Sequence, residues 1–325
     1  MRALRTAVIG AGFMGSHHAR VYAAYPLTSL EAVVDVNPGR AEELATSFKT
    51  RGFDSVEAML REAEVDLVSV CTDDGCHVEP AAACLSAGKH VLLEKPIATT
   101  LEDADAIIDA GRKSEGKLMV GHIVRFEPRY QYVKERVDAG DLGEISSVYA
   151  RRLNHRGAQE RLGGRVSVLS FLGIHDLDYI LWLAREGPVR LYTESTQRIM
   201  RRDGYDTEDQ TFTVIRFADD MIACVEAGWI LPNNHPRRAD FKLEVLGSEG
   251  MAQIDLFSRD IVVGTRSGWQ VPSIGDMLER EISHFVDCVL TDRNPLVSGE
   301  QAREALRLSL AAQESARTGC VVKLT

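Results

Sequence analysis

The chain has 325 residues, of which 45% are hydrophobic, and a formal net charge of −10 at pH 7. This length and apolar content suffice for two domains that each bury a core. The acidic balance argues against a nucleic-acid partner and an anionic membrane surface, because both attract basic proteins, and no apolar run approaches the roughly 20 residues of a membrane span.

The first predicted element is a strand that ends at Val8-Ile9, and the sequence GAGFMG follows at residues 10–15. A helix is predicted over 13–25 and a second strand over 30–35. A strand before this glycine pattern and a helix after it are typical of a Rossmann domain that binds a dinucleotide.

Each glycine has a physical task in such a turn. Gly10 permits the tight turn, Gly12 lets the backbone approach a pyrophosphate, and Gly15 lets the helix lie close to the strand. The helix N-terminus favours the anion, because its N–H groups are free and its dipole is positive there. We therefore expect Phe13 and Met14 to lie beside the cofactor.

Asp35 closes the second strand, about 20 residues after the glycines. A carboxylate there can accept hydrogen bonds from the adenine ribose hydroxyls and repels a 2′-phosphate. The sequence thus predicts NAD rather than NADP. Arg40 is the only nearby cation; we include it among the cofactor-binding candidates, although it suits a solvated first turn of a helix equally well.

Three further buried strands are predicted over 65–70, 90–93 and 118–120. Because parallel strands present their carboxyl ends at one sheet edge, the residues that follow them are expected near the ligand. These cofactor-binding candidates are Cys71, Thr72, His77, Glu94 and Lys95.

Beyond about residue 122 the pattern changes. Alternating segments at 211–217, 221–229 and 241–246 are typical of neighbouring antiparallel strands. Helices are predicted over 169–183, 277–290 and 300–316. The expected fold is α/β, with a Rossmann domain over 1–122 and an α+β domain with an open, mainly antiparallel sheet over 123–325.

The cysteines follow neither a C-x-x-C pattern nor zinc-ligand spacing, so we expect reduced thiols and no metal site. The N-terminal apolar run continues into the glycine turn without a small-residue cleavage site, so we expect a cytoplasmic protein. The six cysteines are Cys71, Cys76, Cys84, Cys224, Cys288 and Cys320.

The chain resembles the glucose-fructose oxidoreductase and inositol dehydrogenase family, also written Gfo/Idh/MocA. The resemblance implies an NAD(P)-dependent oxidoreductase that acts on a ring hydroxyl of a sugar or cyclitol, and a homodimer or homotetramer formed through the exposed face of the second sheet. It is carried by the glycine turn, by Glu94-Lys95-Pro96, and by the segments at residues 121–126, 173–178, 246–250 and 314–319.

Oxidation of an alcohol requires a base for the O–H proton and a group that stabilises the developing alkoxide. Lys95 suits the second task, and His175 suits the first because imidazole titrates near neutrality. Asp178 lies three residues after His175 on one helix face, where it can orient the ring or hold a substrate hydroxyl. These three residues are the predicted catalytic and substrate-binding set.

Phe171 departs from the family pattern, which usually has an aspartate four residues before this histidine. A phenyl ring cannot accept the imidazole proton, so either Asp178 takes over that task or Lys95 and Tyr179 carry the proton transfer. Further substrate-binding candidates are Arg125, Asn154 and His155, although each also suits an exposed polar position.

A basic segment at Arg151-Arg152, Arg156, Arg161 and Arg165 can face a phosphate or carboxylate, or form a solvated loop or subunit contact. Two alternatives to a dehydrogenase remain open. One is a glycoside hydrolase or lyase that retains NAD and oxidises its substrate transiently; the other is a dinucleotide-sensing regulatory protein without catalysis.

Overall fold

The computed structural model describes residues 3–157, 159, 162–255, 261–265, 268–270 and 276–324, with backbone alone at 261–265 and 268–270. The chain forms two compact units. Unit 1 comprises Met1–Phe126 and Asp276–Leu306, and unit 2 comprises Glu127–Gly275 and Arg307–Thr325. The units divide the chain differently from the predicted domains, because residues 276–306 return to the first unit.

The return of this segment has a packing cause. The helix α10 (Met277–Leu290) has one strongly apolar face, and Ile282 and Phe285 on it are fully buried. This face packs against α1 (Phe13–Ala24) and the short 3₁₀ turn Ile123–Phe126. Periodicity predicted the helix correctly, but it does not say which core a helix joins.

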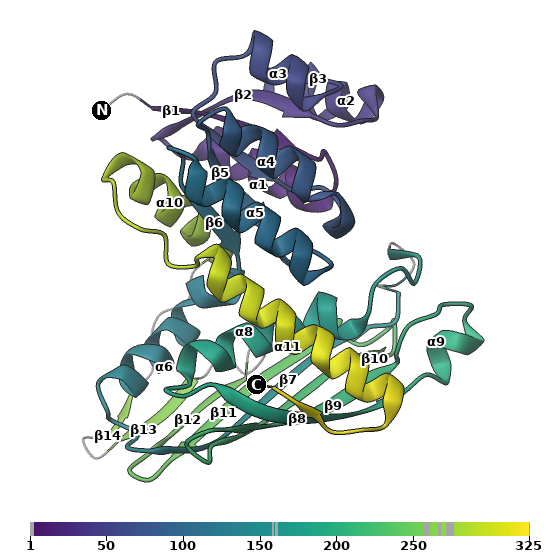
Figure 1. Ribbon diagram of the computed structural model, residues 1–325, viewed down its shortest axis with the longest axis vertical. Coiled ribbons are helices and arrows are strands. Elements are labelled where there is room, and N and C mark those ends of the chain that lie inside the picture. The colour runs from purple at the N-terminus through teal and green to yellow at the C-terminus, as the bar shows by residue number, and fades with distance from the viewer. Residues whose placement is uncertain are drawn as a thin grey trace. The chain divides into compact units, whose positions relative to one another are not determined.

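Unit 1 is built on a parallel sheet of six strands in the order β3-β2-β1-β4-β5-β6 (Figure 1). The order reverses between β1 and β4, and ligands bind at the carboxyl ends of the strands at such a switch point. The strands are β1 (Leu4–Ile9), β2 (Thr28–Val34), β3 (Arg51–Phe53), β4 (Leu67–Val70), β5 (His90–Glu94) and β6 (Leu118–Gly121).

The helices of unit 1 begin at side chains that suit helix starts. Asn37 accepts hydrogen bonds from the Gly39 and Arg40 N–H groups at the start of α2, and Thr100 accepts one at the start of α5. Besides α1 and α10, the helices are α2 (Pro38–Phe48), α3 (Val56–Glu62), α4 (Val78–Ser86) and α5 (Leu101–Lys113).

Unit 2 contains a nine-stranded sheet in the order β14-β13-β12-β11-β7-β10-β9-β8-β15. The pair β7 and β10 is parallel and the other pairs are antiparallel. The strands are β7 (Ile145–His155), β8 (Pro188–Thr196), β9 (Gln210–Phe217), β10 (Ile222–Leu231), β11 (Ala239–Gly247), β12 (Met251–Asp255), β13 (Ile261–Thr265), β14 (Gly268–Gln270) and β15 (Val322–Lys323).

The predicted fold class is confirmed, with one correction to the strand neighbours. β9 and β10 pair as expected, but β7 lies between β10 and β11. Alternation marks a strand and its buried face, while pairing with a strand about 90 residues away leaves no local signal.

Helices cover one face of this sheet (Figure 1): α6 (Pro128–Asp138), α8 (Ile174–Leu183) and the later turns of α11 (Gly299–Thr318). A short helix, α9 (Ile199–Arg202), precedes β9. The predicted helix over 169–183 is divided into a π-helical turn at Leu169–Gly173 and α8. No helix among the described residues combines the length and apolar character of a membrane span.

Candidate active site

The glycine turn has the geometry that a pyrophosphate requires. Gly10 has φ +94°, and a Cβ there would lie 2.7 Å from the Cys71 carbonyl; a Cβ at Gly15 would lie 1.8 Å from the Gly10 oxygen. A Cβ at Gly12 would meet no atom within 4 Å, so this glycine faces open space. The turn therefore fits a bound dinucleotide, with α1 beginning at Phe13.

Asp35 stabilises this turn directly. Its Oδ2 accepts a hydrogen bond from Ala11 N at 2.9 Å, and its Oδ1 accepts one from Asn37 N at 2.8 Å. Each carboxylate oxygen keeps a second lone pair for a ribose hydroxyl. The Arg40 side chain is exposed at the start of α2.

Cys71 and Thr72 follow β4, and their backbone packs against Gly10. Burial raises the pKa of the Cys71 thiol, and the Thr72 hydroxyl donates to Cys76 O at 3.1 Å. Phe13 is 57% exposed and Met14 is half-buried. The structure thus gathers these four predicted cofactor residues around the switch point.

Lys95 is half-exposed, whereas Glu94 before it and Pro96 and Ile97 after it are buried. The Lys95-Pro96 peptide bond is cis. Glu94 points into the interior: its Oε1 lies 3.0 Å from His18 Nε2, and its Oε2 accepts a hydrogen bond from Lys95 N at 3.2 Å. Glu94, predicted beside the cofactor, therefore has both carboxylate oxygens bound to protein.

Although burial alone would raise it, the hydrogen bond from His18 and the charge of Lys95 hold the pKa of Glu94 below its usual value. Glu94 is thus ionised at neutral pH. The segment that presents Lys95 therefore begins at a charged, buried carboxylate.

His77 fixes the other side of the same segment. Its ring is buried, with Nδ1 2.9 Å from Pro96 O and Nε2 3.3 Å from Thr72 O. Burial lowers the pKa of His77, so the ring is neutral and donates through Nδ1. His77, predicted as a cofactor ligand, has both ring nitrogens directed at backbone carbonyls.

Arg125, which the sequence predicts to bind substrate, lies in the interior of unit 1. It is 1% exposed, and its Nη1 donates to Gln301 Oε1 at 3.2 Å within unit 1. The returning segment 276–306 covers the turn that carries it: Arg280 donates to Phe126 O, and His284 packs on the Phe126 ring. Sequence periodicity could not show that covering.

In unit 2, His175 stands at the start of α8 and is half-buried, and Asp178 is fully buried one turn later. Asp176 points away from both: its two oxygens accept from Arg152 Nε at 2.7 Å and Nη2 at 2.8 Å. This buried bidentate pair ties the first turn of α8 to β7.

Tyr179 cannot carry the proton transfer that the sequence left open for it. It is fully buried, and its hydroxyl donates to Tyr130 O at 2.7 Å. Burial raises its pKa well above the usual value. Phe171 lies in the π-helical turn and packs on Trp229, with ring centroids 5.5 Å apart.

Asn154 and His155 lie on opposite faces of β7, since side chains alternate along a strand. Asn154 shares the helix-covered face with Arg152, whereas the His155 ring lies 3.5 Å from Arg238 Nη2. In the basic segment, Arg151 and Arg152 are held in ion pairs within the unit. Arg161 lies outside the described residues.

Comparison with known proteins agrees with this geometry. Residues 4–122 match the profile described as "Oxidoreductase family, NAD-binding Rossmann fold", and residues 130–253 match the "GFO/IDH/MocA C-terminal domain". The UDP-N-acetylglucosamine 3-dehydrogenase of Acidithiobacillus ferrooxidans is 30% identical, covering 94% of this chain and 95% of its own. The chain belongs to the Gfo/Idh/MocA family.

Other members of the family are similar over the same length. The scyllo-inositol 2-dehydrogenase (NAD(+)) of Bacillus subtilis is 28% identical over 99% of this chain and 96% of its own. The solved UDP-N-acetylglucosamine 3-dehydrogenase has a TM-score of 0.85 at 29% identity, covering 97% of this chain and 98% of that chain. Like the family, this protein is an NAD-dependent oxidoreductase.

Two buried polar residues lie near the family's Glu-Lys-Pro segment, and the sequence reasoning missed one of them, Glu281. His18 is buried and binds both Ser69 and Glu94. Glu281 is buried on α10. A signal existed for Glu281, because this acidic residue stands beside Ile282 on the apolar face of a predicted helix. His18, Glu94 and Glu281 each offer a ligand atom within 4.8 Å of the others.

Proposed function

We propose that the protein transfers a hydride between NAD and a secondary hydroxyl group of a sugar or cyclitol. The observation that supports this most directly is Lys95, a half-exposed lysine within a buried segment at the sheet edge that carries the glycine turn. Relatives named for inositol and UDP-N-acetylglucosamine support a polyhydroxylated ring as the substrate class.

Each residue has a separate task in this proposal. The Lys95 ammonium holds the reacting oxygen and stabilises negative charge as it develops. His175 accepts the hydroxyl proton, and Asp178 orients the imidazole in place of the family's aspartate. NAD, which the glycine turn and Asp35 would hold, would supply the hydride acceptor for oxidation of the alcohol to a ketone. Asn154, on strand β7, is proposed to contact a substrate hydroxyl.

The test is NADH formation by the purified protein with a panel of inositols, aldoses, aldonolactones and nucleotide sugars. Stoichiometric NADH and a ketone product support the proposal, and Lys95→Ala serves as the inactive control. Cleavage of a glycoside without net NADH would instead indicate transient oxidation. NAD binding without turnover of any substrate or glycoside would indicate a sensor.

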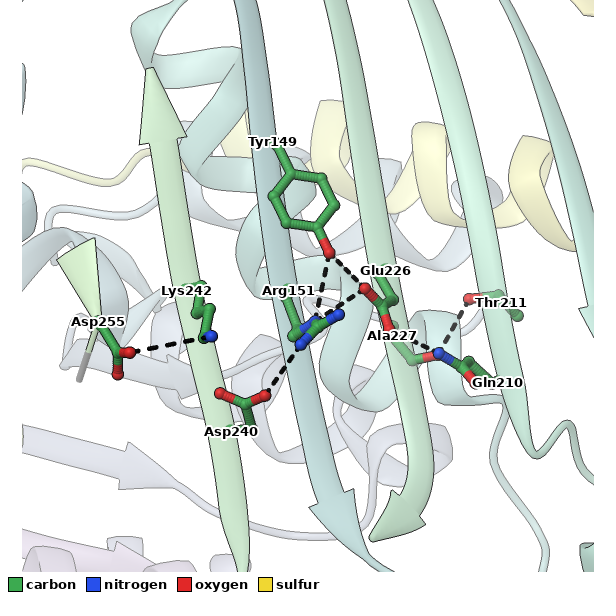
Figure 2. Close-up of polar contacts among 9 residues, drawn as sticks. All are labelled: Tyr149, Arg151, Gln210, Thr211, Glu226, Ala227, Asp240, Lys242 and Asp255. Carbon is green, nitrogen blue, oxygen red and sulfur yellow. Dashed lines mark hydrogen bonds and ion pairs between the residues drawn. The ribbon is translucent and has the colours of Figure 1, made fainter. Parts of the chain in front are cut away.

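We also propose that the protein forms a homo-oligomer through the open face of the nine-stranded sheet, in the cytoplasm, where thiols stay reduced. Phe212, Val214 and Leu246 expose 44–46% of their surface on this face. Beside them is the polar network in Figure 2, in which Arg151 binds Glu226 and Asp240. Such a mixture of apolar and paired polar groups suits a subunit contact.

Light scattering after size exclusion tests this interface. Val214→Lys should reduce the oligomer to monomers, because a buried unpaired charge is costly. Val321→Lys, also at an exposed valine but outside strands β9 to β11, is the matched control. An unchanged mass for Val214→Lys would refute the proposed interface.

A further inference from the structure

Glu281 is an acidic residue in the interior of unit 1. Its side chain is fully buried on α10, and neither carboxylate oxygen has a hydrogen-bond partner among the described residues. A Cβ built on Gly121 would lie 3.5 Å from Oε2, so the carboxyl group points at the carboxyl end of β6. An unpaired buried carboxylate is expensive, so this group requires a proton or a cation.

The neighbouring polar groups form a continuous chain. Tyr22 lies 2.6 Å from Ser69, Ser69 lies 2.9 Å from His18 Nδ1, and His18 Nε2 lies 3.0 Å from Glu94. One set of proton positions satisfies all of them: Tyr22 donates to Ser69, Ser69 donates to His18, and His18 donates to Glu94. Glu94 then accepts from Lys95 N as well.

The two acids therefore differ sharply in partners. Glu94 accepts two N–H hydrogen bonds, while Glu281 accepts none from the described residues. Two charged carboxylates this close in a buried setting cannot both be stable, so the proton resides on Glu281. Two further ionisable groups, Tyr22 and Cys71, lie close to Glu281. Both stay protonated, because burial raises the pKa of each.

We propose that Glu281 is a positioning residue for Lys95: as a neutral acid packed close to His18 and Glu94 it leaves Glu94 as the only charged carboxylate of this cluster, so that Glu94 stays ionised and holds the backbone from which Lys95 emerges. The inference rests on the proposed function, since it concerns the residue that holds the substrate oxygen there. Glu94 is the link, because it faces Glu281 and directly binds the Lys95 amide. His77 holds the segment from the other side, through Pro96 O.

Three variants separate positioning from mere packing. Glu281→Gln keeps a neutral group of the same shape, so kcat should stay within about threefold of the wild type. Glu281→Ala should lower kcat about tenfold with little change in NADH affinity. Ile282→Ala, an equally buried change on the same helix, should lower the melting temperature similarly but leave kcat within about twofold.

A readout that needs no substrate is the rate at which the Lys95 amine reacts with an acylating reagent, measured by mass spectrometry. It should change severalfold in Glu281→Ala and stay unchanged in Ile282→Ala. Equal effects of these two variants on both kcat and labelling would overturn the positioning role. Full activity of Lys95→Ala would instead refute the proposed function. The labelling rate of Lys95 in the Glu281 and Ile282 variants would still show whether Glu281 positions this lysine.

The protonation state is tested by melting temperature against pH. Burial and then the charge of Glu94 raise the pKa of Glu281 well above its usual value. A raised native pKa gives stability that is complete below the unfolded pKa and is lost as pH rises through the native one. As pH rises above the usual pKa of a glutamate and through the raised native one, the wild type should therefore progressively lose stability relative to Glu281→Gln. Two results would contradict a neutral Glu281. One is parallel curves of melting temperature against pH for the wild type and Glu281→Gln; the other is a metal ion that the wild type binds stoichiometrically and Glu281→Gln does not.

Discussion

The segments around Lys95 and His175 are built in different ways. Lys95 follows a strand whose last four residues are buried, and two buried histidines hold its neighbours, one binding Glu94 and one facing Pro96 O. His175 follows a π-helical turn and a half-exposed Phe171. Around Lys95 the sequence keeps the family pattern, whereas before His175 it departs from it.

The physical constraints on the two segments explain this difference. Near Lys95, Gly10 leaves no room for a Cβ against Cys71, so the backbone itself excludes change. Near His175, Phe171 occupies a partly exposed position that packs on one ring, Trp229. A substitution there disturbs no strand of either sheet.

The largest effect is expected for Lys95→Ala. Loss of a positioned charge that stabilises an alkoxide should lower kcat by about two to four orders of magnitude, with NADH affinity nearly unchanged. Steady-state kinetics and NADH fluorescence titration measure the two quantities. Lys113→Ala, an exposed lysine on α5, is the control. Unchanged turnover would show that Lys95 has a structural role and no catalytic one.

His175→Ala tests the other segment. If the imidazole is the base, kcat should fall by about two orders of magnitude or more. In the wild type, kcat/KM should rise with pH across the range where histidines lose their proton, and this rise should vanish in the variant. A variant that keeps both its activity and its pH dependence would return the proton transfer to Lys95, since Tyr179 donates to Tyr130 O in the interior.

The same contrast explains what the sequence could predict. The glycine turn, the strand ends and Lys95 were predicted correctly in place, because local spacing encodes them. The burial of Arg125 and the position of Glu281 could not be predicted, because residues 276–306 return to unit 1 from a distant part of the chain. Similarly, no local pattern indicated that β7 lies between β10 and β11.

A smaller effect is expected for Asp35→Ser. Removing the carboxylate should reduce the preference for NAD over NADP by about tenfold, because the repulsion of the 2′-phosphate disappears. Asp35 also accepts from Ala11 N and Asn37 N, so affinity for both cofactors should fall somewhat. Asp35→Asn, which keeps an acceptor oxygen without the charge, separates the two effects. Equal use of NADP by the wild type would contradict the charge argument.

The smallest effect is expected for Phe171→Asp, which restores the family's acidic residue. Phe171 is half-buried rather than fully buried, so the new carboxylate can reach water and the fold should persist. Loss of the ring contact with Trp229 should cost about 1 kcal/mol, seen as a melting temperature lower by a few degrees.

If Phe171 lines the substrate pocket, this change should alter KM severalfold and leave kcat nearly constant, because the base His175 remains. Phe171→Leu keeps an apolar wall without the aromatic contact, so it should share the loss of stability but not the change in KM. A Phe171→Asp protein that fails to fold would mean that the ring supports the π-helical turn. In that case the phenylalanine would serve packing, and the departure from the family pattern would give no reason to assign the task of the family's aspartate to Asp178.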